Sequence, residues 1–186
     1  MRAAILLAAG ASRRFGRRDK LQARLGSRSL LDHALGNVRA SGACRIILVS
    51  VHPKRIPGTT PVRAPRAKGS LSASLAAGLA ALRPVEREAL IFLADMPYAQ
   101  APRLRLLVGA KAVRPRFRGF PGHPVLVQVA AARAALAQGD AGLGRSLRMA
   151  YAPGSAGHLI DIDTPAALRR VRLHGSRAWR PRSASE

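Results

Sequence analysis

Acidic side chains are scarce in this chain, and three of them stand at the ends of apolar segments. The 186 residues include 32 Lys and Arg but only nine Asp and Glu, which gives a formal net charge of +23. Asp95 follows Leu-Ile-Phe-Leu-Ala, and Asp161 and Asp163 close a later apolar segment. A carboxylate in such a position is suited to holding Mg²⁺ against phosphate oxygens. The simpler alternative for Asp95, which stands shortly before a proline, is a turn-forming role.

A candidate anion site lies between Ala4 and Lys20, where an apolar run leads through small residues into a basic segment. Small residues let the backbone approach a ligand closely, and N–H groups and cations can then bind an anion. Neither the Walker A spacing nor G-x-G-x-x-G is present, so an ordinary strand-to-helix turn stays open as an alternative. The small residues of the turn are Ala8, Ala9, Gly10 and Ala11, and the donors and cations that follow are Ser12, Arg13, Arg14 and Lys20.

Covalent catalysis and zinc chemistry find no support in the residue pattern. The single cysteine, Cys44, cannot form an internal disulfide, and we expect it to be buried packing. The five histidines lack zinc-like spacing, and no G-x-S-x-G elbow is present. His123, which precedes a proline, is more simply a loop or packing residue than a catalyst. Phosphoryl-type transfer needs mainly positioning, a metal ion and cations, and the candidates above supply these.

The high positive charge raises the question of an anionic macromolecular partner. Basic residues are spread over every segment, aromatic residues make up only 4% of the chain, and no familiar nucleic-acid motif is present. We therefore expect no specific nucleic-acid binding. No apolar run approaches the roughly 20 residues of a membrane helix, and no signal-peptide pattern precedes the first strand-like segment. We expect no membrane partner and a cytoplasmic location.

Strand-like and helix-like segments alternate along the chain, which predicts a three-layer α/β domain with a mostly parallel central sheet. We expect strands at residues 2–9, 45–51, 88–94, 125–129 and 158–162, and a short edge strand near Val62. We expect helices at residues 29–39, 70–82, 102–110 and 130–137, and one that begins at Thr164-Pro165. Ligands of such folds bind at the carboxyl ends of the strands, here Gly10, His52, Asp95 and Asp161.

Length and composition fit one domain. A hydrophobic content of 48% is enough to build a core. We assign residues 1–172 to this domain and expect the arginine-rich residues 173–186 to form a disordered basic tail.

Six short motifs resemble those of the molybdenum-cofactor (MobA-like) nucleotidyltransferases, and most closely their cytidylyltransferase branch. They occur in the family's order from residue 4 to about residue 172. The first reads Leu-Ala-Ala-Gly-x-Ser-x-Arg-x-Gly with a lysine downstream. The motifs span residues 7–20, 72–79, 93–97, 122–125, 139–142 and 161–165. One such motif is weak evidence, but six in register are specific.

The resemblance implies a Rossmann-like nucleotidyltransferase domain that transfers CMP from CTP to the terminal phosphate of molybdopterin and releases pyrophosphate. It implies Mg²⁺ as the cofactor and a molybdoenzyme as the recipient of the product. CTP is favoured over GTP because the guanylyl branch typically has Leu-Ala-Gly-Gly in the first motif, where this chain has Ala9.

The resemblance also implies a role for each matched residue. The backbone of Leu7, Ala8, Ala9 and Gly10 would meet the nucleotide base, with Ser12, Ser72 and Ser74 by the nucleotide. Arg13 and Lys20 would hold the triphosphate, and Asp95, with Asp161 or Asp163, would place Mg²⁺; Arg13, Lys20 and Asp95 are the catalytic candidates. Gly122, His123 and Pro124 would lie by the pterin acceptor.

Three positions depart from the family pattern, and they weaken the prediction of the nucleotide more than that of the fold. Ser29 stands where proline is usual, Ala64 replaces a frequent asparagine, and Gly69 is one residue out of step. GMP transfer and a phosphorylated acceptor such as a sugar phosphate remain alternatives. So does a non-catalytic basic module that binds RNA or an acidic protein.

Overall fold

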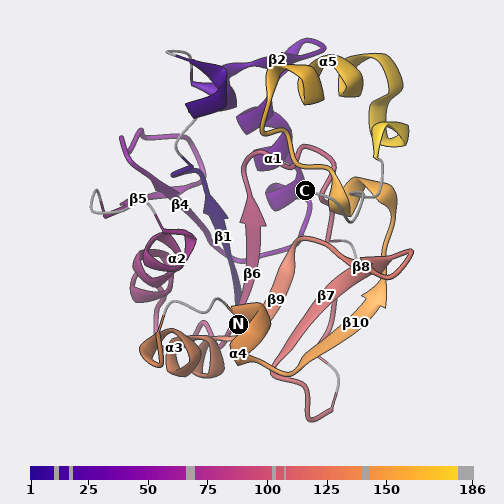
Figure 1. Ribbon diagram of the computed structural model, residues 1–186. Helices are drawn as coiled ribbons and strands as arrows, with labels where there is room; N and C mark the ends of the chain where they lie inside the picture. The colour runs from indigo at the N-terminus through magenta and orange to yellow at the C-terminus, as the bar shows by residue number, and fades with distance from the viewer. Residues whose placement is uncertain are drawn as a thin grey trace.

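The computed structural model describes residues 1–10, 13–16, 19–65, 70–101, 104–106, 108–139 and 143–179 (Figure 1). An eight-stranded sheet forms its centre, with the order β10-β7-β9-β6-β1-β4-β5 and with β8 paired to β7. Its strands are β1 (Arg2–Leu7), β4 (Ile46–Ser50), β5 (Thr60–Arg63), β6 (Glu88–Leu93), β7 (Ala112–Phe117), β8 (Phe120–Pro121), β9 (Val125–Gln128) and β10 (Met149–Pro153).

The sheet is mostly parallel, as the sequence predicts. Strands β6, β1, β4 and β5 run parallel to one another, and so do β7 and β10. Strand β9 is antiparallel to both of its neighbours, β6 and β7, and therefore joins the two parallel groups. The predicted edge strand near Val62 is β5.

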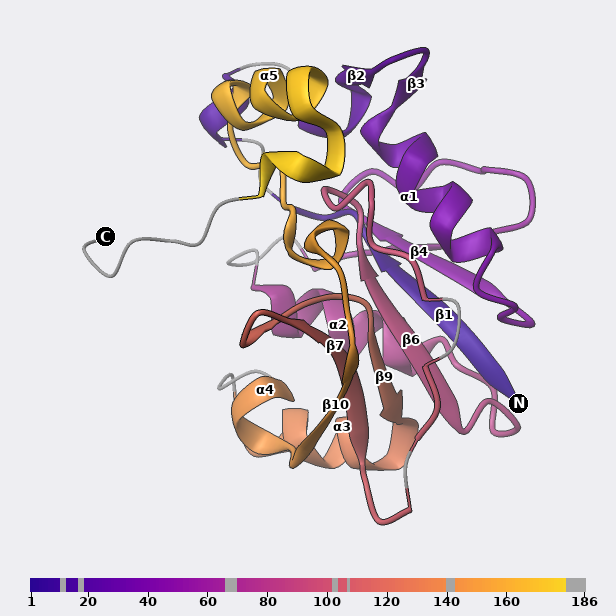
Figure 2. The ribbon, with the colours of Figure 1, turned by 90° about the vertical axis from the view of Figure 1, so that its right-hand side faces the viewer.

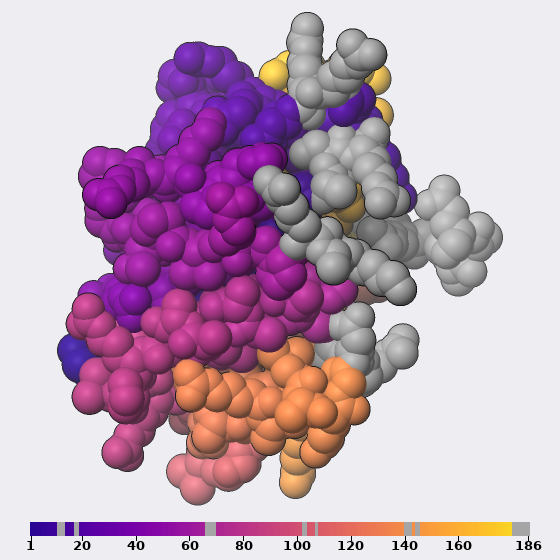
Figure 3. Space-filling view, turned by 90° about the vertical axis from the view of Figure 1, so that its left-hand side faces the viewer, coloured from indigo at the N-terminus to yellow at the C-terminus, as the bar shows by residue number. Residues whose placement is uncertain are grey.

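Helices cover both faces of the sheet and make three layers (Figure 2). Helix α1 (Leu30–Arg39) packs on one face, and α2 (Leu71–Ala80) and α3 (Val129–Ala137) on the other. Figure 3 shows the α2 and α3 segments, in magenta and orange, one above the other on that face, in agreement with their contacts. A short helix, α4 (Leu143–Ser146), follows α3. Close packing of α2 requires Gly78, because a Cβ there would lie 2.7 Å from Cγ2 of Ile5 on β1.

A third apolar cluster stands over the carboxyl ends of the central strands and supports the site. It joins the hairpin of β2 (Arg24–Leu25) and β3 (Arg28–Ser29) to α5 (Pro165–His174) and to the 3-10 turn at Gly175–Ala178. Helix α5 begins as predicted, because Thr164 Oγ1 accepts a hydrogen bond from Ala167 N at 3.0 Å and proline occupies the first turn.

The structure corrects four expectations. The predicted strand at 158–162 is instead a 3-10 turn (Ala156–Leu159) followed by chain outside the sheet. Residues 104–106 and 108–110 are not helical. Cys44 is exposed.

The fourth correction concerns the tail predicted to begin at residue 173. Helix α5 continues to His174, and the turn that follows buries Ala178 to 2% exposure, so the ordered domain extends through Trp179. Residues 180–186 lie outside the described residues. Within the described part of the chain, no helix is both long enough and apolar enough to cross a lipid bilayer.

Candidate nucleotidyl-transfer site

Lys20, Asp95 and Asp163 converge at the carboxyl end of β6 from three distant parts of the chain. The Lys20 ammonium donates hydrogen bonds to Asp95 Oδ2 at 2.7 Å and to Asp163 Oδ1 at 2.8 Å. Lys20 starts a 3-10 turn (Lys20–Gln22) that Asp19 caps by accepting from Leu21 N. Asp95 directly follows β6 and Ala94, and its carbonyl accepts from Ile162 N at 3.0 Å, which ties the two acidic segments together.

Lys20 is almost fully buried, with 6% of its surface exposed. Burial alone would lower its pKa, but the charge of Asp95 and the hydrogen bonds to both carboxylates outweigh burial, so the pKa of Lys20 is raised. The ammonium is therefore charged at neutral pH. A buried cation between two carboxylates is a preorganised electrostatic site rather than a surface ion pair.

The two carboxylates fit a magnesium site. Asp95 Oδ1 is buried and has no hydrogen-bond partner, although a buried carboxylate oxygen normally has one. Nowhere in the described residues do three or more His, Cys, Asp or Glu side chains gather to hold a metal ion. The chain thus supplies two carboxylates at this site, which is the number Mg²⁺ commonly takes from a protein when phosphates and water complete its shell.

A pocket of about 610 Å³ opens beside Asp163. Its lining combines cations and aromatic rings with two carboxylates, and the carboxylates come from the segment just before α5. Polar lining side chains include Arg14, Arg114, His123, His158, Asp161, Asp163 and Arg170, and the aromatic ones are Phe120 and Trp179. The volume is typical of small-molecule sites.

His123 lies in the wall of this pocket as a neutral ring. Burial, followed by the positive charge of nearby Arg114, lowers the pKa of His123 to about 4. Its Nδ1 is buried without a partner, while the ring also makes a hydrogen bond to the backbone of Ile91. The neighbouring Gly122 leaves no room for a side chain, because a Cβ there would meet the carbonyl oxygen of His158. This turn is therefore held in place at the pocket wall.

The family model for the MobA-like NTP transferase domain matches residues 4–155 of this chain. The chain belongs to the MobA-like NTP transferase family. No curated protein sequence matches it.

Solved structures share the fold of this MobA-like NTP transferase at low sequence identity. Rv0371c from Mycobacterium tuberculosis is 23% identical, with 92% of this chain and 97% of that chain covered and a TM-score of 0.76. The 2-C-methyl-D-erythritol 4-phosphate cytidylyltransferase of Thermus thermophilus is 18% identical, with 93% and 98% covered and a TM-score of 0.71. The molybdopterin-guanine dinucleotide biosynthesis protein A of Archaeoglobus fulgidus is 18% identical, with 93% and 97% covered and a TM-score of 0.65.

The nucleotide-loop candidates of this MobA-like NTP transferase follow β1. Leu7 is buried at the end of the strand, and Ala8 N donates to Val49 O at 2.8 Å. Ala9 is partly buried against the α2 face, and Gly10 is exposed. Ala8 and Gly10 also line a second pocket, of about 480 Å³, with Ser50 at the end of β4 and His52 beyond it.

Other candidates are less well placed or lie outside the described residues. Ser72 is partly buried and Ser74 is buried on α2, and neither lines the two pockets above. Ser12 and the side chain of Arg13 lie outside the described residues. Arg14, which lines the pocket beside Asp163, also holds the arginine position of the first motif counted from Leu7, so it joins Arg13 as a candidate.

The two C-terminal aspartates occupy different positions. Asp163 contacts Lys20 and completes the cluster with Asp95, whereas Asp161 is exposed in the pocket wall. The sequence left open which of them joins Asp95, and the geometry favours Asp163. Of the three residues predicted to lie by the acceptor, Gly122 and His123 line the pocket and Pro124 is buried beside them.

Four residues near the site were not predicted from the sequence. Arg114, Arg170 and Trp179 line the pocket beside Asp163, and Ser50 has a buried hydroxyl without a partner in the second pocket. Arg114 and Arg170 are two among many arginines, and Trp179 stands in the segment predicted to be a tail. The single tryptophan of the chain was the one usable signal.

Proposed function

We propose that this chain transfers CMP from CTP to the terminal phosphate of molybdopterin and releases pyrophosphate. The observation that carries the proposal is the convergence of Lys20, Asp95 and Asp163 beside a pocket large enough for a phosphorylated acceptor. Family membership supports nucleotidyl transfer, and the six motifs with Ala9 favour the cytidylyl branch.

In the proposed reaction, an ionised phosphate oxygen of the acceptor attacks the α-phosphorus of CTP in line with the leaving pyrophosphate. No general base is needed, because the attacking phosphate is already deprotonated. The protein's main tasks are to align the two phosphates and to offset the charge that gathers on the pyrophosphate. Mg²⁺, when held by Asp95 and Asp163, would add neutralisation of negative charge on the nucleotide oxygens.

Lys20 has a defined part in this scheme. Its ammonium bridges the two carboxylates at 2.7 and 2.8 Å, close to where a divalent cation would bind them. A second cation at this place would repel the ammonium, so Lys20 would turn from the carboxylates to the triphosphate when nucleotide and metal bind. Arg14, which lines the pocket beside Asp163, would support the same anion from the loop after β1, and we propose the same role for Arg13 from its place in the first motif.

The decisive experiment measures pyrophosphate release with CTP or GTP and a panel of acceptors that includes molybdopterin. We expect release with CTP and molybdopterin in Mg²⁺, and we expect CTP to protect the protein against thermal unfolding more than GTP does. GTP preference in both measurements would replace CMP transfer by GMP transfer. Absence of any nucleotide effect, with RNA binding that falls steeply with salt, would favour the non-catalytic basic module.

A polyol phosphate is a second candidate acceptor. The structural likeness to the Thermus thermophilus 2-C-methyl-D-erythritol 4-phosphate cytidylyltransferase, with its TM-score of 0.71, motivates this alternative. The same assay separates the two acceptors, since a polyol phosphate would then release pyrophosphate where molybdopterin does not.

A further inference from the structure

Trp179 closes one side of the pocket that begins at Asp163. It follows the 3-10 turn after α5, and its ring makes edge-to-face contacts with Phe117 and Phe120, each at 5.6 Å between ring centroids. Because the preceding Ala178 is buried, the backbone that carries the ring is anchored in the apolar cluster under α5. An aromatic ring fixed in this way offers an apolar surface to a ligand at little cost in conformational entropy.

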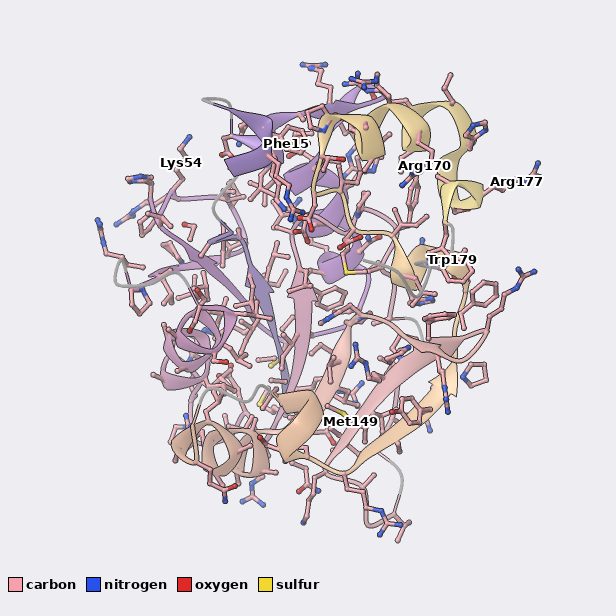
Figure 4. All side chains as sticks on the ribbon, in the orientation of Figure 1. Phe15, Lys54, Met149, Arg170, Arg177 and Trp179 are labelled. Atoms are coloured by element: carbon pink, nitrogen blue, oxygen red, sulfur yellow. The ribbon has the colours of Figure 1, made fainter. Side chains whose placement is uncertain are left out.

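The cationic side of the pocket is built differently. Arg114 on β7 donates a hydrogen bond to the carbonyl oxygen of Gly122 at 2.9 Å, and burial lowers the pKa of Arg114. This hydrogen bond stabilises the pocket wall. Arg170 on α5 is exposed at the pocket and lies above Trp179 on the same side of the molecule (Figure 4). Guanidinium groups bind phosphate by paired hydrogen bonds, so Arg170 is the freer of these two for an anionic ligand.

Nucleotidyl transfer constrains how an acceptor lies in this pocket. Its reacting phosphate must approach the end where Asp163 stands, because Asp163 and Asp95 belong to one cluster. The body of the acceptor then extends along the rest of the lining, which includes Phe120 and Trp179. An aromatic wall favours a flat ring system, whereas a polyol gains little from it.

We propose that Trp179 and Arg170 are the specificity-determining residues of the acceptor pocket, and that they select a planar heteroaromatic compound bearing a phosphate over a polyol phosphate. Trp179 contacts the ring and Arg170 the phosphate. The proposal rests on the proposed function for the identity of the pocket as the acceptor site, but it concerns binding and can be tested without turnover.

Trp179 is the only tryptophan in the chain, so its fluorescence reports on this pocket alone. The probes are neopterin monophosphate, neopterin and ribose 5-phosphate, titrated by fluorescence and by calorimetry without nucleotide. We expect neopterin monophosphate to change the fluorescence and to bind at least tenfold tighter than ribose 5-phosphate. Equal affinities, or no fluorescence change on binding, would overturn the proposal in the wild-type protein itself.

Substitutions distinguish the contributions of Trp179 and Arg170, and calorimetry measures the affinity of each variant for the three probes. Trp179→Leu should bring the affinities for neopterin monophosphate and ribose 5-phosphate within threefold of each other, and Trp179→Phe should keep most of the preference. Arg170→Gln should weaken both phosphates about tenfold and leave neopterin unchanged. Arg177→Gln removes the same charge from a nearby side chain that points away from the pocket, and should change none of the three (Figure 4). Retained preference in Trp179→Leu would show that the ring contributes nothing.

Failure of this inference is distinguishable from failure of the proposed function. Pyrophosphate release from CTP with a polyol phosphate but no preference for the pterin would preserve nucleotidyl transfer and remove the role of Trp179. Selective pterin binding without nucleotide-dependent turnover would preserve the pocket and remove the proposed reaction.

Discussion

The two halves of the molecule, which we name for their proposed roles, differ in how much of each strand is buried. The nucleotide half, around β1, β4 and β6, consists of strands whose side chains are buried on both faces; in β1 five of six residues are buried. The acceptor half, around β7, β10 and α5, has less buried strands: three of six residues are buried in β7, which reads Ala-Val-Arg-Pro-Arg-Phe, and none of five in β10. In the nucleotide half, the need to pack both faces of the sheet determines which residues the strands contain. The second carries arginines and aromatic rings that face a pocket.

This difference assigns different tasks to the halves. The nucleotide half and the segment before α5 supply the charged cluster of Lys20, Asp95 and Asp163, which any acceptor would need. In the proposed reaction, the acceptor half supplies the pocket wall, which would distinguish one acceptor from another. Changes in the cluster should therefore reduce turnover with every acceptor, and changes in the wall should alter acceptor affinity and the stability of that half.

The largest effect is expected from Asp95→Asn. The substitution keeps the shape of the side chain but removes the charge that Lys20 contacts and that the proposed metal would use, so we expect pyrophosphate release to fall about 10³-fold or more with every acceptor. Glu88→Gln is the matched control, because Glu88 stands at the opposite end of β6 and pairs with Arg2. Near-normal release by a folded Asp95→Asn protein would contradict the assignment of the cluster.

Lys20→Met should lower turnover about 10²-fold, as expected for one preorganised contact with the leaving group. The same change should raise the affinity of the nucleotide-free protein for Mn²⁺, measured by calorimetry, about tenfold, since the ammonium no longer competes for the carboxylates. Lys111→Met, at an exposed lysine just before β7 that lines neither pocket described above, is the control. Unchanged Mn²⁺ affinity would mean that Lys20 and the metal do not share a place.

The difference in burial between the two halves also explains which strands could be predicted from the sequence. Uninterrupted apolar runs predicted β1, β4 and β6 and the parallel core, because burial on both faces leaves a strong pattern. Strand β7 was missed because Arg114, Arg116 and Pro115 break that pattern. The segment at 158–162 is apolar enough for a strand, but it packs in the cluster under α5, and only tertiary contacts decide between these outcomes.

Prediction of the site is limited in the same way, because tertiary contacts decide which residues meet. Asp95 and Lys20 were predicted from their places beside a strand end and in a motif. Their direct contact across 75 positions, and the addition of Asp163 across 143, depend on how the chain folds back on itself. Trp179 was missed for the same reason, since the residues around it look like a polar tail until α5 and Ala178 are seen to anchor them.

Gly78→Ala tests the close packing of the nucleotide half. The added Cβ would lie 2.7 Å from Ile5 Cγ2 and 3.1 Å from Val49 Cγ2, both in the core, so we expect a loss of about 1–3 kcal/mol in the free energy of unfolding. Gly36→Ala on α1 is the control, because its Cβ would meet only the flexible guanidinium of Arg28. There the gain in helix propensity should leave stability unchanged or slightly raised in urea unfolding. Equal effects of the two changes would contradict this packing.

The smallest effect tests the acceptor half through the buried ring of His123. Its folded-state pKa of about 4 lies below the ordinary 6.5, so below pH 6.5 the unfolded chain binds a proton that the folded protein excludes. The stabilisation is present above that pH and is lost progressively as pH falls toward 4, by about 1–2 kcal/mol at pH 5. His123→Asn, measured by urea unfolding between pH 7 and pH 5, should lose this part of the pH dependence. His52→Asn, at an exposed histidine beyond β4, should keep it. All three proteins carry the same carboxylates, so identical pH profiles would mean that His123 is accessible to protons. The pocket wall at His123 would then be open rather than packed.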